Sequence, residues 1–235
     1  MRSAAPAFIA LLACCSVLLA QPKATPDEEV LNYSVNYPSG LSLGEARLES
    51  KKTKAPDGGS DGWELLFTLG ASIPGFEVAD KFRSVATAGY CSVEFEKDSK
   101  HGKSVTRELA TFDQKAGSVT RRTVGGGQSQ LQISGCAKDA LAFLNYFRRE
   151  VDAGRVPPAQ AVYFGGPYQV RLEYAGRQRL TVGDERMDTD RIRVSVKGKA
   201  SDITFEVFLS LDAGRRPVLV RVPLMPGTFS MELVP

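Results

Sequence analysis

The chain has 235 residues, with 30 Lys and Arg against 27 Asp and Glu, 43% apolar residues, one His and four Cys. This composition is that of a globular domain and excludes a disordered or collagen-like chain. A net charge of +3 is too small for a nucleic-acid-binding surface, and one His excludes a metal site built from several histidines.

The first twenty residues are typical of a secretory signal peptide. Arg2 precedes an apolar run from Ala4 to Ala20, and a polar stretch begins at Gln21. We expect cleavage after Ala20, which gives a protein exported to the periplasm or cell envelope, with no transmembrane segment after cleavage. Two alternatives stay open: an uncleaved N-terminal membrane anchor, because the run approaches the length of a membrane span, and a lipoprotein processed at Cys14.

Cleavage of this signal would remove two of the four cysteines and leave Cys91 and Cys136. An isolated pair in an oxidising compartment usually forms a disulfide, and we predict one here. The chain-entropy model gives such a bond a stabilisation of about 4 kcal/mol. Two buried free thiols are the alternative, and redox chemistry is less favoured because the sequence has no Cys-x-x-Cys spacing.

A polar leader with two prolines covers residues 21–29, and a single β-rich domain is expected over residues 30–235. Apolar residues alternate with polar ones from Leu31 to Tyr37, which is the period of a half-buried strand. A second strand is expected from Leu41 to about Lys52, with a bulge or a close backbone approach at Gly44.

A polar loop is expected over residues 51–61, and the clearest alternation in the chain then runs from Trp63 to Ala71. Turn sequences such as 98–102 and 114–117 separate the next alternating segments. These segments predict strands at 78–87, 90–96, 105–112 and 118–124.

The segment from Lys138 to Val151 differs because its apolar residues recur at helical spacing. Gly154 is placed to end this helix, and Pro157-Pro158 prevents its continuation. After it, strands are expected at 161–164, 168–174, 178–182, 186–196, 204–211, 217–222 and 228–234. We therefore predict a mainly β fold: a single strongly curved antiparallel sheet, barrel-like and closed or incompletely closed, with one main helix around residues 138–151.

This pattern resembles a family of secreted bacterial envelope proteins catalogued as domain of unknown function 3108. The opening from Leu31 to Leu48 is similar to its first hairpin, Asn145 to Arg148 to its helix, and Leu209 to Leu233 to its last hairpin. The resemblance implies an exported protein with a barrel-like sheet and a helix, similar in shape to the lipoprotein carriers of the bacterial envelope. The family has no established activity, so the resemblance implies no catalytic residue.

No catalytic, metal-binding or cofactor-binding set can be recognised. His101 is expected to be a solvated turn residue, and no Gly-x-Ser-x-Gly elbow presents a nucleophilic serine. The glycines 125–127 lack the Gly-Lys-Ser/Thr of a phosphate loop and predict a hairpin connection. The acidic stretch 184–190 contains arginine and fits no Ca²⁺ loop, which favours ion pairs on a solvated face. Of the dispersed arginine pairs, only Arg148 is a candidate buried partner for a carboxylate.

The aromatic residues are the remaining candidates for a binding site. Most of them predict an ordinary core. If the curved sheet leaves a cavity, however, we expect Trp63, Phe67, Phe143 and Phe147 to line it, as in barrels that hold one apolar ligand.

These observations favour an exported, non-enzymatic protein that binds a lipid-like or glycan component of the cell envelope, or that assists envelope assembly, without a cofactor. One alternative is a structural or protein-interaction module that uses an exposed sheet edge. A second alternative is a hydrolase with an unrecognised pair of carboxylates facing one cleft.

Overall fold

The computed structural model describes residues 26–54, 61–199, 202–224 and 227–234. The predicted signal peptide, its cleavage site and Cys14 lie outside these residues, as do residues 21–25 of the polar leader. Within the described ranges, no helix is both long and apolar enough to cross a membrane.

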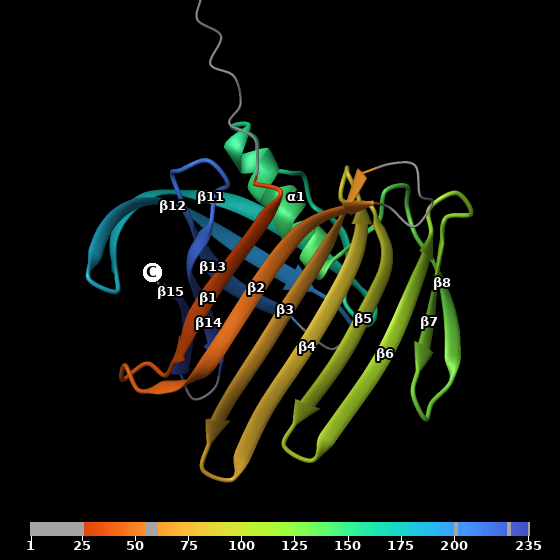
Figure 1. The fold of residues 1–235 in the computed structure, drawn as a ribbon, viewed down its shortest axis with the longest axis horizontal. Helices are drawn as coiled ribbons and strands as arrows, with labels where there is room; N and C mark the ends of the chain where they lie inside the picture. The colour runs from red at the N-terminus through yellow and green to blue at the C-terminus, as the bar shows by residue number, and fades with distance from the viewer. Residues whose placement is uncertain (1–25, 55–60, 200–201, 225–226, 235) are drawn as a thin grey trace, which may run out of the picture.

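In the part of the chain that the structure describes, one sheet of fifteen strands curves around one helix (Figure 1). The helix is α1 (Ala140–Asp152). The strands are β1 (Glu28–Asn36), β2 (Ser42–Lys54), β3 (Asp61–Ile73), β4 (Phe76–Thr87), β5 (Ser92–His101), β6 (Ser104–Asp113), β7 (Ser118–Thr123), β8 (Gln128–Gln132), β9 (Lys138–Asp139), β10 (Gln160–Tyr163), β11 (Pro167–Val182), β12 (Glu185–Lys197), β13 (Asp202–Ser210), β14 (Pro217–Leu224) and β15 (Gly227–Val234).

The sheet consists of two runs of neighbouring strands, which meet where the first strand of the chain pairs with the last. The first strand, β1, pairs antiparallel with the last, β15, so the order runs from β8 down to β1 and then from β15 down to β9. Strands β9 and β10 pair in parallel, and the other pairs are antiparallel. Because the order ends at β8 and β9, the sheet is not closed. The predicted curved, mainly antiparallel sheet with one helix is confirmed in its incompletely closed form.

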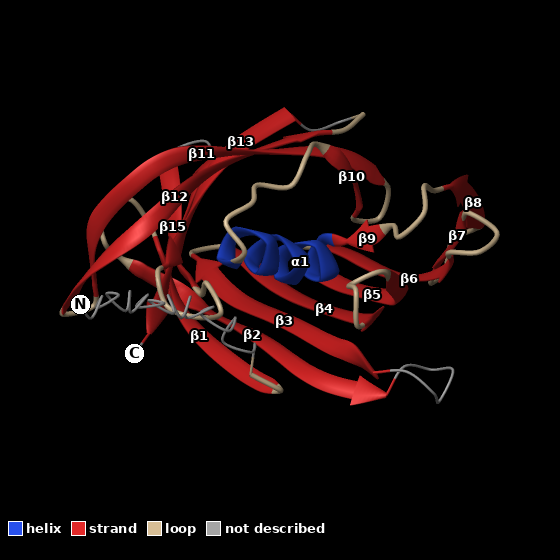
Figure 2. Ribbon diagram, turned by 90° about the horizontal axis from the view of Figure 1, so that it is seen from above, coloured by secondary structure: helices blue, strands red, loops and turns tan. Residues whose placement is uncertain are grey.

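Helix α1 lies in the hollow of the curved sheet, between its two halves (Figure 2). It begins two residues later than predicted, because Lys138 and Asp139 form the short strand β9. Leu141 and Ala142 pack in a core cluster built largely on β1 to β7. On another side of the helix, Phe143, Phe147 and Val151 pack against β10 to β13. The helix therefore fills part of the space between two apolar walls.

The predicted close approach at Gly44 is confirmed. A Cβ atom placed on Gly44 would lie 1.9 Å from the carbonyl oxygen of Gly70 on the neighbouring strand β3. The pairing of β1 with β2 also shifts between Val35 and Asn36, opposite this glycine, as expected for a bulge. Only glycine fits at this position without moving the backbone of β3.

Strand β11 is longer than the sequence predicts. The two strands expected at 168–174 and 178–182 form one strand, because a shift in the pairing with β12 between Tyr174 and Arg177 absorbs the irregularity. Gly176 lies in this shifted segment with a φ of 96°, a conformation that glycine adopts at little cost. A bulge thus replaces the predicted break between strands.

Two other segments belong to strands that the sequence does not predict. Residues 98–101 are predicted as part of a turn, and residues 128–132 carry no prediction. Strand β5 continues through residues 98–101, because these residues pair with β4 on one side and β6 on the other. Strand β8 is polar and short, so its sequence gives no clear alternation, yet it pairs with β7 and forms one edge of the sheet. Cross-strand pairing, which composition does not encode, extends the sheet at both places.

Candidate binding cavity

An apolar cavity of about 550 Å³ lies between helix α1 and the inner face of the sheet. This volume is within the range of about 300 to 1,000 Å³ that is typical of sites for small molecules. The lining side chains come from the helix, from one wall of four strands and from a second wall of six. They are Tyr33, Leu48, Phe67 and Phe82 on β1 to β4; Ala140, Leu141, Phe143, Leu144 and Phe147 on α1; and Val162, Phe164, Tyr168, Val170, Leu172, Val194, Val196, Ile203, Phe205, Val207, Pro217, Val220 and Met231 on β10 to β15 and the residue that follows β10.

The chemistry of this lining is almost entirely that of hydrocarbon. Tyr33 and Tyr168 carry the only side-chain oxygen atoms in the lining set that the structure describes, and none of these residues is acidic, basic or a histidine. Several lining side chains, among them Phe67, Val196 and Phe205, are only half-buried, so their apolar surface remains accessible from the cavity. Covering such a surface with a hydrocarbon chain removes it from water, which favours binding.

Of the four residues expected to line a cavity, Phe67, Phe143 and Phe147 lie in the lining and Trp63 does not. Trp63 stacks on Tyr90, with 5.5 Å between the ring centroids. It points to the inner side of the sheet but lies at the start of β3, away from the cavity. Most of the second wall consists of valines and other aliphatic residues that the sequence marks only as inward positions of strands.

A buried carboxylate fixes the start of helix α1. Asp139 is fully buried, and its Oδ2 atom accepts hydrogen bonds of 2.6 Å from the hydroxyls of Ser84 and Ser92. Its Oδ1 atom accepts the backbone N–H groups of Leu141 and Ala142 at 2.9 and 3.0 Å, as an N-cap does. Burial raises the pKa of Asp139, while these four hydrogen bonds oppose that rise. The carboxylate therefore ties the helix to strands β4 and β5.

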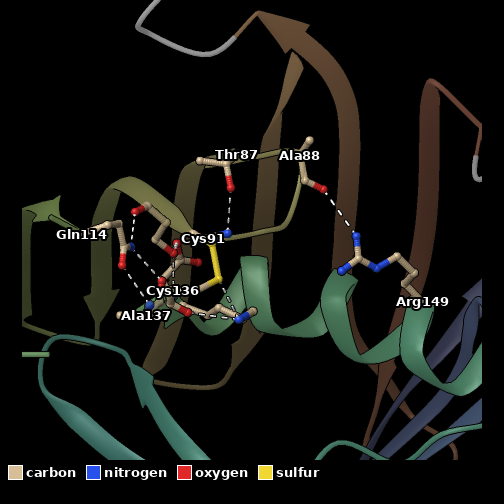
Figure 3. The surroundings of a disulfide bond; sticks show 10 residues. Thr87, Ala88, Cys91, Gln114, Cys136, Ala137 and Arg149 are labelled. Carbon is tan, nitrogen blue, oxygen red and sulfur yellow. Dashed lines mark hydrogen bonds between the residues drawn. A yellow bond between two sulfur atoms is a disulfide. The ribbon is translucent and has the colours of Figure 1, made fainter. Parts of the chain in front are cut away.

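The predicted disulfide between Cys91 and Cys136 is confirmed, with 4.6 Å between the Cα atoms (Figure 3). It joins the turn between β4 and β5 to the segment that leads into β9. Gln114 reinforces this junction: its side-chain amide donates to the carbonyls of Ser92 and Ala137 and accepts the N–H of Ala137. The two halves of the open sheet are thus held together near the start of the helix.

The other end of the helix is held by a buried ion pair. The guanidinium of Arg148 lies 2.7 Å from the carboxylate of Glu29 on β1 and donates to the backbone carbonyls of Gly214 and Arg215. It also donates to the side-chain oxygen of Asn145. Glu29 falls in the segment assigned from sequence to the unpacked leader, but β1 already begins at Glu28. The sequence suggests a buried carboxylate partner for Arg148, and the structure identifies it as Glu29.

The remaining sequence motifs lie outside the cavity. His101 ends strand β5, and its Nε2 atom lies 3.0 Å from the carboxylate of Asp80. The glycines 125–127 form the hairpin connection from β7 to β8, as predicted, with the N–H of Thr123 donating to the carbonyl of Gly127. Neither feature brings a nucleophile beside an acid or a base.

The acidic stretch 184–190 is less solvated than predicted. Asp188 pairs with Arg179 on the surface, which lowers the pKa of Asp188. Asp190, in contrast, is buried, and it accepts hydrogen bonds from Arg215 at 2.8 Å and from the Tyr174 hydroxyl at 3.0 Å. Arg215 comes from the turn between β13 and β14, so this contact depends on the fold and not on neighbouring residues.

Carboxylates also meet on the outer side of the sheet. Arg83 on β4 contacts Glu64, Glu94 and Glu96, with N–O distances of 2.7 to 3.1 Å. The three carboxylates share this one guanidinium on an accessible surface, away from the apolar cavity. In the part of the chain that the structure describes, no group of three or more His, Cys, Asp or Glu side chains is arranged to hold a metal ion.

Comparison with models of protein families gives a match. A family model described as "Protein of unknown function (DUF3108)" matches residues 32–234, which extend from β1 to the end of β15. A search of curated proteins finds no match. The matched range covers both walls of the cavity and the helix between them.

Proposed function

The chain belongs to the DUF3108 family, and from this premise we propose that it is an exported, non-enzymatic protein that binds one lipid-like molecule between helix α1 and the sheet. The observation that carries the proposal is the cavity of about 550 Å³ with its hydrocarbon lining. Burial of apolar surface contributes roughly 25 cal/mol per Å² to the binding free energy. A hydrocarbon ligand enclosed by the two walls and the helix would therefore be held without polar contacts.

The same lining favours a lipid-like ligand over a glycan. A glycan carries many hydroxyl groups. Burying each of them without a hydrogen-bond partner raises the free energy of the complex and so weakens binding. The lining set offers two tyrosine hydroxyls, on Tyr33 and Tyr168, which is too few for a sugar ring. We therefore narrow the expected envelope component to one with a hydrocarbon chain.

The polar groups around the cavity support binding without catalysis. Asp139, the most deeply buried carboxylate beside the helix, uses its oxygens to cap α1 and to hold Ser84 and Ser92. His101 and Asp80 are paired with each other at the far end of β5. General acid–base chemistry needs such a group within reach of a bound substrate, and the lining contributes none.

Two features support export to the cell envelope. The apolar run from Ala4 to Ala20 has the composition of a secretory signal. The Cys91–Cys136 disulfide is of the kind that persists in oxidising compartments and is rare where thiols are kept reduced.

A substitution in the cavity wall tests the proposal. Titration of the full chain with the apolar fluorophore N-phenyl-1-naphthylamine is expected to give a saturable rise in fluorescence. Val196→Glu places a carboxylate in the lining of β12 and is expected to weaken binding about tenfold, because the charge must be desolvated or must hold water in the cavity.

The matched control is Ser195→Glu. Ser195 precedes Val196 on the same strand and faces the outer side, where its hydroxyl meets that of Thr204 at 3.1 Å. This variant is expected to bind the fluorophore as the unmodified chain does. The absence of saturable binding to the unmodified chain, or an equal loss in both variants, would rule out the cavity as the binding site.

A further inference from the structure

We infer that the lipid-like molecule held in the cavity has an anionic headgroup, such as a carboxylate, which pairs with the ammonium of Lys97 at one side of the cavity. The inference rests on the proposed function and adds the charge of the ligand and the residue that binds its headgroup. It makes Lys97 the residue that orients an acidic amphiphile, with the hydrocarbon chain inside the cavity.

The pairing of the strands places Lys97 directly beside the cavity lining. Phe67 on β3 pairs with Phe82 on β4, and Phe82 pairs with Lys97 on β5. Directly paired residues point to the same face of a sheet, with their Cβ atoms about 5 Å apart. Because Phe67 and Phe82 both line the cavity, Lys97 is the next side chain in the same inward row. A ligand that covers Phe82 therefore lies within reach of the ammonium on its flexible four-carbon stem.

A lining residue of the opposite wall also adjoins this ammonium. Phe164, which follows β10, packs against Phe82 with 5.1 Å between the ring centroids. The ammonium of Lys97 lies 4.6 Å from the centre of the Phe164 ring. Lys97 and Phe164 are both half-buried, so protein does not enclose the ammonium completely. The lysine thus adjoins one lining side chain from each wall of the cavity.

The positive charge of Lys97 lacks an anionic partner. Among the residues that the structure describes, no carboxylate forms an ion pair with its ammonium. Glu108 lies directly opposite on β6, but its carboxylate pairs with the guanidinium of Arg121 at 3.6 Å. Arg121 also donates to the carbonyl of Gly165, the residue after Phe164, at 2.6 Å. The two cations and the one carboxylate leave a positive charge in excess, which an anionic headgroup would neutralise.

The inward face of β5 changes from apolar to polar at Lys97. Its successive inward positions are Phe95, which is buried in the core, and then Lys97, Ser99 and His101. The Nε2 atom of His101 lies 3.0 Å from the carboxylate of Asp80, an inward residue of β4. An amphiphile with its chain among the phenylalanines would therefore place its headgroup beside polar side chains, where a charge keeps favourable contacts.

The experiment measures displacement of N-phenyl-1-naphthylamine from the full chain by dodecanoate and by 2-tridecanone, an uncharged ligand of similar length. Lys97→Met is expected to bind dodecanoate roughly tenfold more weakly, the effect of losing one hydrogen bond between charged groups. It is expected to bind 2-tridecanone as tightly as the unmodified chain does. Lys97→Arg keeps the positive charge and is expected to retain most of the affinity for dodecanoate.

Lys81→Met is the matched control. Lys81 precedes Phe82 on β4, so its side chain is exposed on the outer side of the sheet. Its replacement changes the net charge by the same amount as Lys97→Met, and a general attraction of anions to the protein would weaken equally in both variants. Dodecanoate is expected to bind Lys81→Met as it binds the unmodified chain.

The outcomes separate the inference from the proposed function. If neither ligand displaces the fluorophore from the unmodified chain, both are wrong. If 2-tridecanone binds but dodecanoate does not, or if dodecanoate binds Lys97→Met and Lys81→Met equally well, the cavity holds a chain without a headgroup site, which overturns the inference alone. Equal losses for both ligands in Lys97→Met would show that the lysine only shapes the cavity, and would overturn it as well.

Discussion

Replacement of Arg148 by alanine is expected to lower the free energy of unfolding by about 3 to 5 kcal/mol. The side chain of Arg148 is almost completely buried and joins three parts of the chain: helix α1, Glu29 on β1 and the turn that contains Gly214 and Arg215. Without the guanidinium, a buried carboxylate and two carbonyls lose their partner together. Urea unfolding of the variant and the unmodified chain measures the difference.

Two further variants test this explanation. Arg148→Lys is expected to recover only a small part of the loss, because one ammonium cannot reproduce the fork of donors that reaches Glu29 and both carbonyls. Arg148→Met combined with Glu29→Met is expected to be more stable than Arg148→Ala, because no buried charge is left unpaired. A loss below about 1 kcal/mol for Arg148→Ala would show that the ion pair does not hold the helix in place.

Asp139→Ala is expected to destabilise the protein by roughly 3 to 5 kcal/mol, the combined effect of a lost N-cap and of two lost hydrogen bonds to a charged group. The hydroxyls of Ser84 and Ser92 would lose their acceptor in the interior, and Leu141 and Ala142 would lose the acceptor for their backbone N–H groups. Urea unfolding gives the loss, and faster amide exchange at Leu141 and Ala142 would locate it at the start of the helix.

The controls for Asp139 separate charge from hydrogen bonding. Asp139→Asn keeps an oxygen for the backbone N–H groups and is expected to lose less stability than Asp139→Ala. Asp188→Ala removes an exposed carboxylate that pairs with Arg179 and is expected to change stability little. Equal effects of Asp139→Ala and Asp188→Ala would show that the buried carboxylate is not needed to fix the helix.

Much of the fold follows from patterns that are local in the sequence. Alternation from Leu31 to Tyr37 and from Trp63 to Ala71 reflects strands with one buried face, and helical spacing over residues 138–151 reflects a helix packed on its apolar side. The two cysteines outside the predicted signal peptide leave one pairing to consider. These features depend on residues within a few positions of each other or on a single choice of partner.

The apolar cavity and the contacts around it depend on partners distant in the chain. Glu29 and Arg148 are separated by 119 positions, so the strand residue gives no local sign of its partner. Trp63 and Phe67 share the same alternation on β3, yet only Phe67 lies in the cavity lining. Periodicity assigns a side chain to a face of the sheet, whereas a cavity depends on the distance between that face and the opposite wall.

The most direct test is to locate a bound hydrocarbon chain on the protein. The full chain, with isotope-labelled methyl groups on Ile, Leu, Val and Met, can be mixed with unlabelled 2-tridecanone and examined for nuclear Overhauser effects between ligand and protein. Binding inside the sheet predicts contacts to methyl groups of the lining, including Leu144, Val196 and Val220. Contacts confined to exposed methyl groups outside the lining, such as those of Val105 and Leu224, would contradict a lipid-binding cavity.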